Sequence, residues 1–406
     1  MKKNTLFVIG VLLITFSITA QTEATNQVAK YRRSSLYTMM IDDQSRPYAN
    51  VIRASFEKGP IPEKFNDHNL GTRVIPTSNA KDESGNISAF LENNHVARDV
   101  VAKWFNRSST GGFNMDLIAN RGSYDASALD IAKAKASQRG LESVADAGEE
   151  LIKNTFVLVN DYNYVSKEEV AKKVNGWLDK IGSVASAAGM SGIADTASLT
   201  GAAVGVAGKG YVVKTTAYLY RLVWNEETAA IFYNDYWADD KTITPEKKQA
   251  FENSGIFKLE LVGFDTSWAD VQSSVFTKKT EEELIEKATI KAVDAVIVKL
   301  QKNHDEFKTK TPLYSGSPTI SAKIGLKEGL SDKSKFDVLE QRQNKDGKTE
   351  YVVVGSLKVD DSQPIWDNRY GADEENPNST TDRTFFKKTG GGTFYAGMLI
   401  VQKKGK

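Results

Sequence analysis

The N-terminal segment constrains the fold most, because it predicts the compartment in which the rest of the chain must fold. Two lysines follow Met1, an apolar stretch covers residues 6–14, and the small Ala20 precedes the polar Gln21. A basic start, an apolar centre and a small final residue are typical of a secretory signal peptide. The apolar stretch is too short to span a bilayer. We therefore expect residues 1–20 to be removed near Ala20, leaving a periplasmic or secreted protein.

The chain contains no cysteine among its 406 residues. Disulfides, thiolate nucleophiles and cysteine metal sites are therefore excluded. Exported proteins often depend on disulfides for stability, so apolar burial has to hold this fold together. The length is enough for two or three domains.

Charge and histidine content argue against several classes of function. Lysine and arginine number 53 and aspartate and glutamate 52, and the two signs are interspersed. Without a basic field, binding to nucleic acid is not expected. Only three histidines are present, which argues against imidazole-based acid–base or metal chemistry. We expect no cofactor and no bound metal.

Apolar patterns predict an α+β domain over residues 126–312, with helices on a small, mainly antiparallel sheet. Strands are indicated at 155–159 and 211–224, and at 256–262, where apolar and charged residues alternate. Thr280 and three glutamates after it predict the start of a helix whose apolar residues fall four apart up to Leu300. Residues 21–125 contain many turn signals, and we expect an irregular region there with short strands at 36–41 and 73–75.

The C-terminal part, residues 313–406, has a different pattern. Short strands are indicated at 319–324, 336–339, 351–359 and 398–402, separated by turns. This spacing predicts a small β-barrel. The acidic loop at 371–382 is expected to be solvated, and the glycines at 390–392 are expected to form a turn of the barrel.

Two stretches of the C-terminal part carry a resemblance to a known family. They are Ile324-Gly325-Leu326-Lys327-Glu328-Gly329-Leu330 and Tyr395-Ala396-Gly397-Met398-Leu399-Ile400. Residues 319–406 resemble the SH3-like C-terminal barrel of the periplasmic flagellar assembly protein T of Gram-negative bacteria. The whole chain also resembles exported Gram-negative proteins of unknown activity. The resemblance implies an SH3-like barrel and carries no activity with it, because its motifs are glycine and apolar positions.

A tract of mostly small residues, Gly182 to Gly208, is the least usual feature of the chain. It includes Gly201 and Gly205 at the spacing of a close-packing helix motif. Three interpretations remain open: a flexible loop or short helical hairpin, a surface for self-association or partner docking, and contact with a membrane. The content of glycine, serine and threonine makes the last of these the weakest.

Two groups of side chains are candidate sites. Tyr233, Tyr236 and Trp237 belong to an aromatic cluster that would suit a sugar-binding platform if exposed and an ordinary core if buried, and the pattern favours the core. Asp67 and His68 would suit a divalent metal, although no further ligand stands at helical spacing, which favours a simple turn.

No constellation of catalytic residues emerges from the sequence, so we name none. We expect a non-enzymatic envelope or secreted protein that mediates protein–protein contacts in assembly or scaffolding, with an envelope protein or a second copy as its partner. The alternative is a module that binds glycan or peptidoglycan through exposed aromatic residues. A metal-dependent hydrolase around Asp67 and His68 is the third hypothesis.

Overall fold

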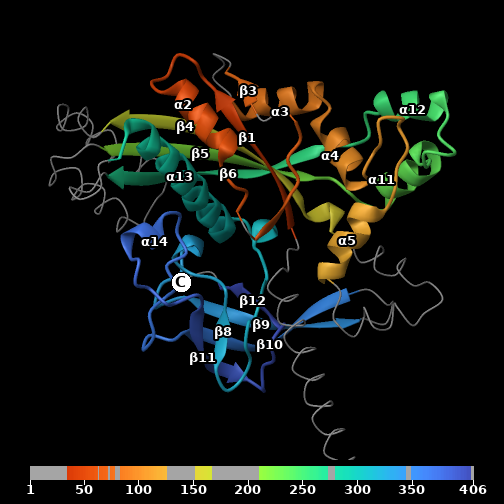
Figure 1. Cartoon of the computed structure of the whole chain (residues 1–406). Coiled ribbons are helices and arrows are strands. Elements are labelled where there is room, and N and C mark those ends of the chain that lie inside the picture. Colours follow the sequence, from red (N-terminus) through yellow and green to blue (C-terminus); the bar gives the residue numbers. More distant parts are fainter. Residues whose placement is uncertain are drawn as a thin grey trace, which may run out of the picture.

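A computed structural model of the chain describes residues 34–62, 64–71, 74–77, 83–125, 151–166, 210–272, 279–343 and 349–403 (Figure 1). These residues form a mixed sheet covered by helices, followed by a nearly closed antiparallel barrel. The predicted fold class, an α+β part followed by a small barrel of the SH3-like kind, is confirmed. The expected signal peptide and the Gly182–Gly208 tract, with Gly201 and Gly205, lie outside the described residues.

The first sheet has the strand order β2-β1-β4-β5-β6, and β3 pairs with β1 beside β2. Its long pairings, β4 with β5 and β5 with β6, are antiparallel, as predicted. The shorter pairings of β1 with β2, β3 and β4 are parallel. The strands are β1 (Ser34–Asp42), β2 (Phe65–Asp67), β3 (Val74–Pro76), β4 (Thr155–Ser166), β5 (Gly210–Leu222) and β6 (Leu259–Gln272).

One of the short strands predicted within residues 21–125 is an inner strand of this sheet. Residues 34–41 of β1 are all buried, and the strand lies between β2 and β4. Ser35 pairs with Thr155 and Met40 with Asn160, so the partner comes from a distant part of the chain that a local pattern does not reveal. The short strands predicted at 36–41 and 73–75 are therefore confirmed as parts of β1 and β3, and the division near residue 125 stays a prediction.

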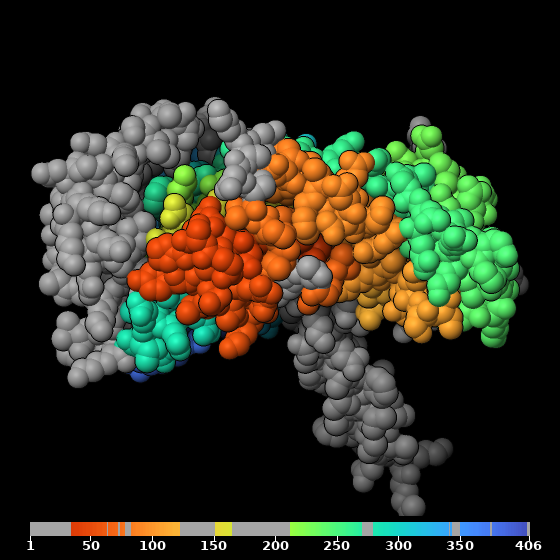
Figure 2. Space-filling model, turned by 90° about the horizontal axis from the view of Figure 1, so that it is seen from above, coloured from red at the N-terminus to blue at the C-terminus, as the bar shows by residue number. Residues whose placement is uncertain are grey.

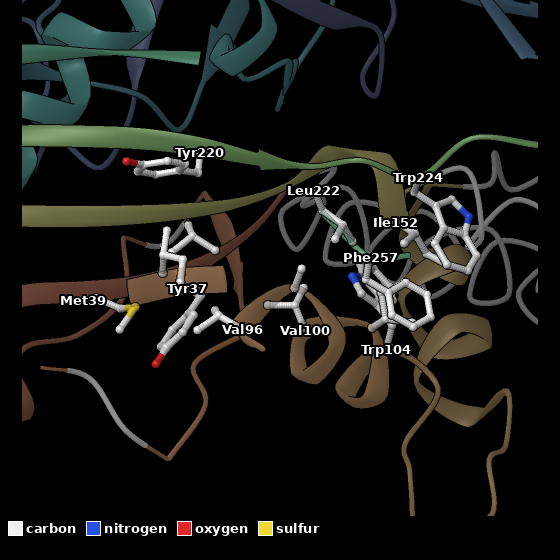
Figure 3. Packing of buried hydrophobic residues seen from close by; sticks show 14 of the residues in the cluster. Tyr37, Met39, Val96, Val100, Trp104, Ile152, Tyr220, Leu222, Trp224 and Phe257 are labelled. Atoms are coloured by element: carbon white, nitrogen blue, oxygen red, sulfur yellow. The ribbon is translucent and has the colours of Figure 1, made fainter. Parts of the chain in front are cut away.

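Helices cover both faces of the sheet. On one face, α13 (Glu281–Asn303) packs over β5 and β6 beside α2 (Ala49–Lys58). Its first turn is fixed by a capping box between Thr280 and Glu283, as the sequence predicts. On the other face lie α3 (Glu83–Asn93) and α4 (Val96–Trp104), whose apolar residues join those of the sheet in one core (Figure 3).

A lobe rich in aromatic residues lies at one end of the sheet, and we define this aromatic lobe as residues 105–113 and 224–257. It holds α11 (Glu226–Ile231), a π-helix (Phe232–Tyr236) and α12 (Pro245–Glu252), and α5 (Asp116–Asp125) follows its first segment. Seen from above, α2, α3 and α4 lie across the molecule, and the green segment with α11 and α12 lies at one end (Figure 2). The lobe extends the core that α4 and the sheet share.

The barrel has the strand order β7-β12-β9-β10-β11-β8, and every pairing in it is antiparallel. A bridge between Ser315 and Ser321 brings the two end strands close. The sequence analysis did not predict β11. The loop at 371–382 contains the short helix α14 (Ala372–Glu375). The strands are β7 (Thr311–Pro312), β8 (Ile320–Ala322), β9 (Lys335–Gln343), β10 (Thr349–Val359), β11 (Thr384–Gly391) and β12 (Leu399–Gln402).

The barrel lies below the sheet and α13 in the view of Figure 1, and its segment Leu326–Glu328 contacts α13. Lys64 lies 3.7 Å from Glu328 of the barrel, and Lys327 lies 3.7 Å from Asp294 of α13. Gly329 fits closely against Val298, because a Cβ there would lie 2.6 Å from a Val298 methyl carbon. The two parts are therefore joined by packing and by charge. None of the helices in the described residues is both long and apolar enough to cross a bilayer.

Candidate functional site

An open groove on the barrel is the candidate site that the structure brings to light. It has a volume of about 680 Å³ and crosses the N-terminal half of β11, between the segment that leads into β8 and the turn that follows β10. We call it the barrel groove. Its lining residues are Ser317, Pro318, Thr319, Ile320, Asp360, Gln363, Phe385, Phe386, Lys387 and Lys388.

Phe385 and Phe386 connect the barrel groove to the barrel core. Strand residues alternate between two faces, so Phe386 points into the core, where it is 5% exposed and packs edge-on against Phe336 at 5.3 Å. Phe385 points the other way and is half-buried. The packing of Phe386 in the core therefore fixes the side to which Phe385 points.

Two charged side chains of the barrel groove, Lys387 and Asp360, form an ion pair. The Lys387 ammonium lies 2.7 Å from a carboxylate oxygen of Asp360 and 2.6 Å from one of Asp361. Asp360 also accepts hydrogen bonds from the N–H and the hydroxyl of Ser362. The hydrogen bond from Lys387, with those from Ser362, lowers the pKa of Asp360 to about 2. Asp360 is therefore a carboxylate at neutral pH and unsuited to act as a general acid.

Lys388 differs from Lys387, since its ammonium donates to the Gly392 carbonyl at 3.1 Å. Among the described residues, no carboxylate lies within salt-bridge distance of it. The barrel groove thus combines a half-buried aromatic ring, an ion pair and one cation without a carboxylate partner. This combination suits contact with another molecule more than proton transfer.

The three aromatic residues predicted as a binding platform are half-buried in the aromatic lobe. Trp237 stacks on Phe113 with ring centroids 5.9 Å apart, and Tyr236 packs against Phe251 at 6.0 Å. Tyr233 contacts Trp237 at 5.7 Å. The three residues lie in the same lobe, and the ring of each packs against residues of the core. This placement agrees with the core interpretation that the sequence favours.

His68 is fully buried and hydrogen-bonded at both ring nitrogens. Nδ1 lies 2.8 Å from an Arg121 guanidinium nitrogen, and Nε2 lies 2.9 Å from the Val100 carbonyl oxygen. Because arginine only donates, Nδ1 accepts, and Nε2 carries the proton and donates to Val100. Burial, together with the neighbouring Arg121, lowers the pKa of His68 well below its ordinary value of 6.5. The imidazole is thus neutral and fully used in the core.

This arrangement does not suit a metal centre at Asp67 and His68. Arg121 donates to the Asp67 carbonyl at 2.9 Å, and the Asp67 carboxylate accepts from the N–H of Asn69 at 2.8 Å. Within the described parts of the chain, no three histidine, aspartate or glutamate side chains gather closely enough to hold a metal. A cation is also repelled by Arg121. The hydrolase hypothesis therefore loses the geometry on which it depended.

Sequence reasoning missed the barrel groove, although one signal pointed to this part of the chain. Gly390 and Gly391 follow two lysines, and we expected a turn there. The structure places both at the end of β11, where the pairing with β10 is bulged. Gly391 has φ of +96°, and a Cβ there would lie 2.4 Å from the Val354 carbonyl oxygen. The glycines therefore let β11 cross β10 closely, next to the groove.

Fold and site together define a two-part α+β protein whose small barrel carries an open, charged and aromatic groove. Neither the models of known protein families nor the curated proteins give a match to this chain. The functional assignment therefore has to come from the geometry.

Proposed function

We propose that this chain is a non-enzymatic protein of the cell envelope, or a secreted one, that works by binding an envelope protein through the barrel groove. The observation that carries the proposal is the groove itself, in which a half-buried ring and a cation without a carboxylate partner lie on β11. Aromatic side chains are enriched at the centres of protein interfaces, and polar and charged side chains form the rims. Export rests on the N-terminal pattern described above.

Site-specific photocrosslinking tests this proposal directly. A photoreactive phenylalanine analogue at position 385 should form an adduct with one protein of defined mass in cells of the native host. The same analogue at Val353, which is 58% exposed on β10 and outside the barrel groove, is the matched control. An adduct that forms equally at both positions, or at neither, would contradict the proposal.

Glycan or peptidoglycan binding by the aromatic lobe is the alternative. One observation supports it: Tyr233 and Tyr236 lie on a π-helix, and such helices occur frequently at functional sites. Binding of the purified chain to isolated peptidoglycan should then fall when Tyr236→Ala is introduced. Binding that persists in both Tyr236→Ala and Trp237→Ala, with the fold intact by circular dichroism, would remove this alternative.

A further inference from the structure

Helix α5 is held against the first sheet by buried side chains of two kinds. Figure 1 shows this helix at the margin of the first part, below α4 and α11 in that view. Of residues 116–121, the part of α5 whose side chains the structure describes, Ile118 and Arg121 are buried. Ile118 belongs to the apolar core. Arg121 donates to the Ser35 hydroxyl at 3.0 Å and to the Asp67 carbonyl at 2.9 Å. One apolar and one charged side chain therefore hold this part of the helix.

Arg121 also covers the one atom of His68 that can take up a proton. Nε2 already carries a hydrogen and donates it to the Val100 carbonyl, so a second proton can bind only at Nδ1. The imidazole is 0% exposed, and an Arg121 guanidinium nitrogen lies 2.8 Å from Nδ1. A proton therefore reaches Nδ1 only after Arg121 has moved away. Arg121 cannot return afterwards, because two N–H donors would then face each other.

Charged groups from three elements surround the imidazole. Burial first, and then the cations Arg121 on α5 and Lys103 on α4, lower the pKa of His68. The Asp67 carboxylate on β2 attracts these two cations, since it opposes the lowering of the pKa that burial causes in both. The groups that β1 and the Trp104 ring contribute are uncharged. A protonated His68 would therefore meet two positive charges beside a carboxylate that they already share.

We infer that α5 is a pH-controlled latch, which acid releases from the sheet because protonated His68 and Arg121 exclude each other. Release is local, since the partners of Arg121 lie on or beside β1, β2 and α4, which remain joined by strand pairing and by the shared core. It uncovers the face of Trp104 on which the guanidinium lies, 4.4 Å from the ring centre. The latch is separate from the barrel groove, whose lining residues all belong to the barrel.

Hydrogen exchange of the full chain at pH 7.5 and at pH 5.0 measures the release of α5. When α5 is open, His68 takes up a proton with its ordinary pKa of 6.5, so the opening constant should rise about 30-fold between these pH values. The amides of α5, corrected for the intrinsic pH dependence of exchange, should lose protection by this factor. They should also exchange faster than the amides of α13 at both pH values, because release of the latch is a smaller opening than global unfolding.

Protection of α5 that does not change with pH would overturn the inference. So would a single exchange rate for α5 and α13 at pH 5.0, because only global unfolding would then respond to acid. In His68→Gln the side-chain oxygen can still accept from Arg121 but takes up no proton, so the protection of α5 should no longer depend on pH. His95→Gln, which replaces an exposed imidazole, is the matched control and should keep the full dependence. A dependence that persists in His68→Gln would also contradict the latch.

A second variant tests the latch from the side of α5, should His68→Gln disturb the packing of the core. Arg121→Met keeps an apolar side chain of similar length and removes the hydrogen bonds, so α5 should lose protection already at pH 7.5. The further loss at pH 5.0 should be smaller than in the wild type, because no guanidinium opposes a proton at Nδ1. Protection equal to that of the wild type at pH 7.5 would show that Arg121 does not hold α5, and the inference would fail.

Discussion

His68 and Arg121 are two basic side chains that share one buried site beneath Trp104. The Arg121 guanidinium lies 4.4 Å from the centre of the Trp104 ring and donates to Ser35 at 3.0 Å. Burial lowers the pKa of Arg121 to about 10, so it stays charged at neutral pH. Two adjacent buried cations would repel each other, so the site is stable only while His68 is neutral.

Acid should therefore destabilise the folded chain through His68. In the unfolded chain His68 takes up a proton below its ordinary pKa of 6.5, whereas the folded chain resists it. Stability then falls as the pH drops below 6.5, by at most about 1.4 kcal/mol per pH unit until the folded pKa is reached. Urea unfolding at a series of pH values measures this slope.

The slope should decrease in His68→Gln. It should persist in His95→Gln, because His95 is exposed. An unchanged slope in His68→Gln would show that the neutral imidazole does not govern acid stability.

At the scale of the element, predictability depended on whether a pattern was local. The Thr280 cap and the four-residue spacing up to Leu300 predicted α13, and the apolar stretch after Thr155 predicted β4. The strand β11 was missed because its sequence, from Thr384 to Gly391, has two adjacent phenylalanines, two adjacent lysines and two glycines in place of alternation. Neighbouring strands, which the local sequence does not show, determine that it is a strand.

The candidate sites, too, could be predicted only where a local pattern determines them. Alternation over residues 256–262 predicted Phe257, Leu259 and Leu261 on one half-buried face, and Phe257 and Leu259 do pack against the core. Leu261 pairs with Tyr220 on the same face, yet it is 43% exposed because β6 is the last strand of the sheet among the described residues, and a local alternation does not show which strand is at an edge. The barrel groove was not predicted because its walls come from three separate segments of the chain.

Gly355 shows how closely the barrel elements approach one another. A Cβ at this position would lie 2.4 Å from Cζ of Phe394 and 2.6 Å from the Gly390 carbonyl oxygen. Gly355→Ala should therefore cost about 1–3 kcal/mol of stability, as overpacked cores do. Gly392→Ala is the matched control, with nothing within 4 Å of its added Cβ. Equal melting temperatures for the two variants would show that the barrel relaxes around position 355.

At the scale of the whole molecule, one of the contacts that join the barrel to the first part runs through Glu328, which faces Lys64 beside β2. Glu328 accepts from the N–H of Gly325 and from Asn368 at 2.9 Å, and Lys64 faces it. Burial lowers the pKa of Lys64, and Glu328 opposes this shift. The pair therefore holds a partly buried charge at the boundary, which costs free energy when one partner is missing.

Removal of one charge of the Lys64–Glu328 pair should thus destabilise the fold more than removal of both. Glu328→Gln should destabilise the chain by about 1–3 kcal/mol, because Lys64 loses its carboxylate. Lys64→Met in the same chain should restore part of this loss. Urea unfolding of the wild type, the two single variants and the double variant measures the coupling. Costs that simply add would show that the two side chains act independently.

The central claim is that the chain acts by contact through the barrel groove, and competition tests it most directly. The photoreactive chain, labelled at position 385, is exposed to envelope extract with a growing excess of unlabelled protein. We predict that the adduct disappears with wild-type competitor and persists with Phe385→Asp competitor at the same excess. An adduct that both competitors remove equally, or that neither removes, would contradict the claim.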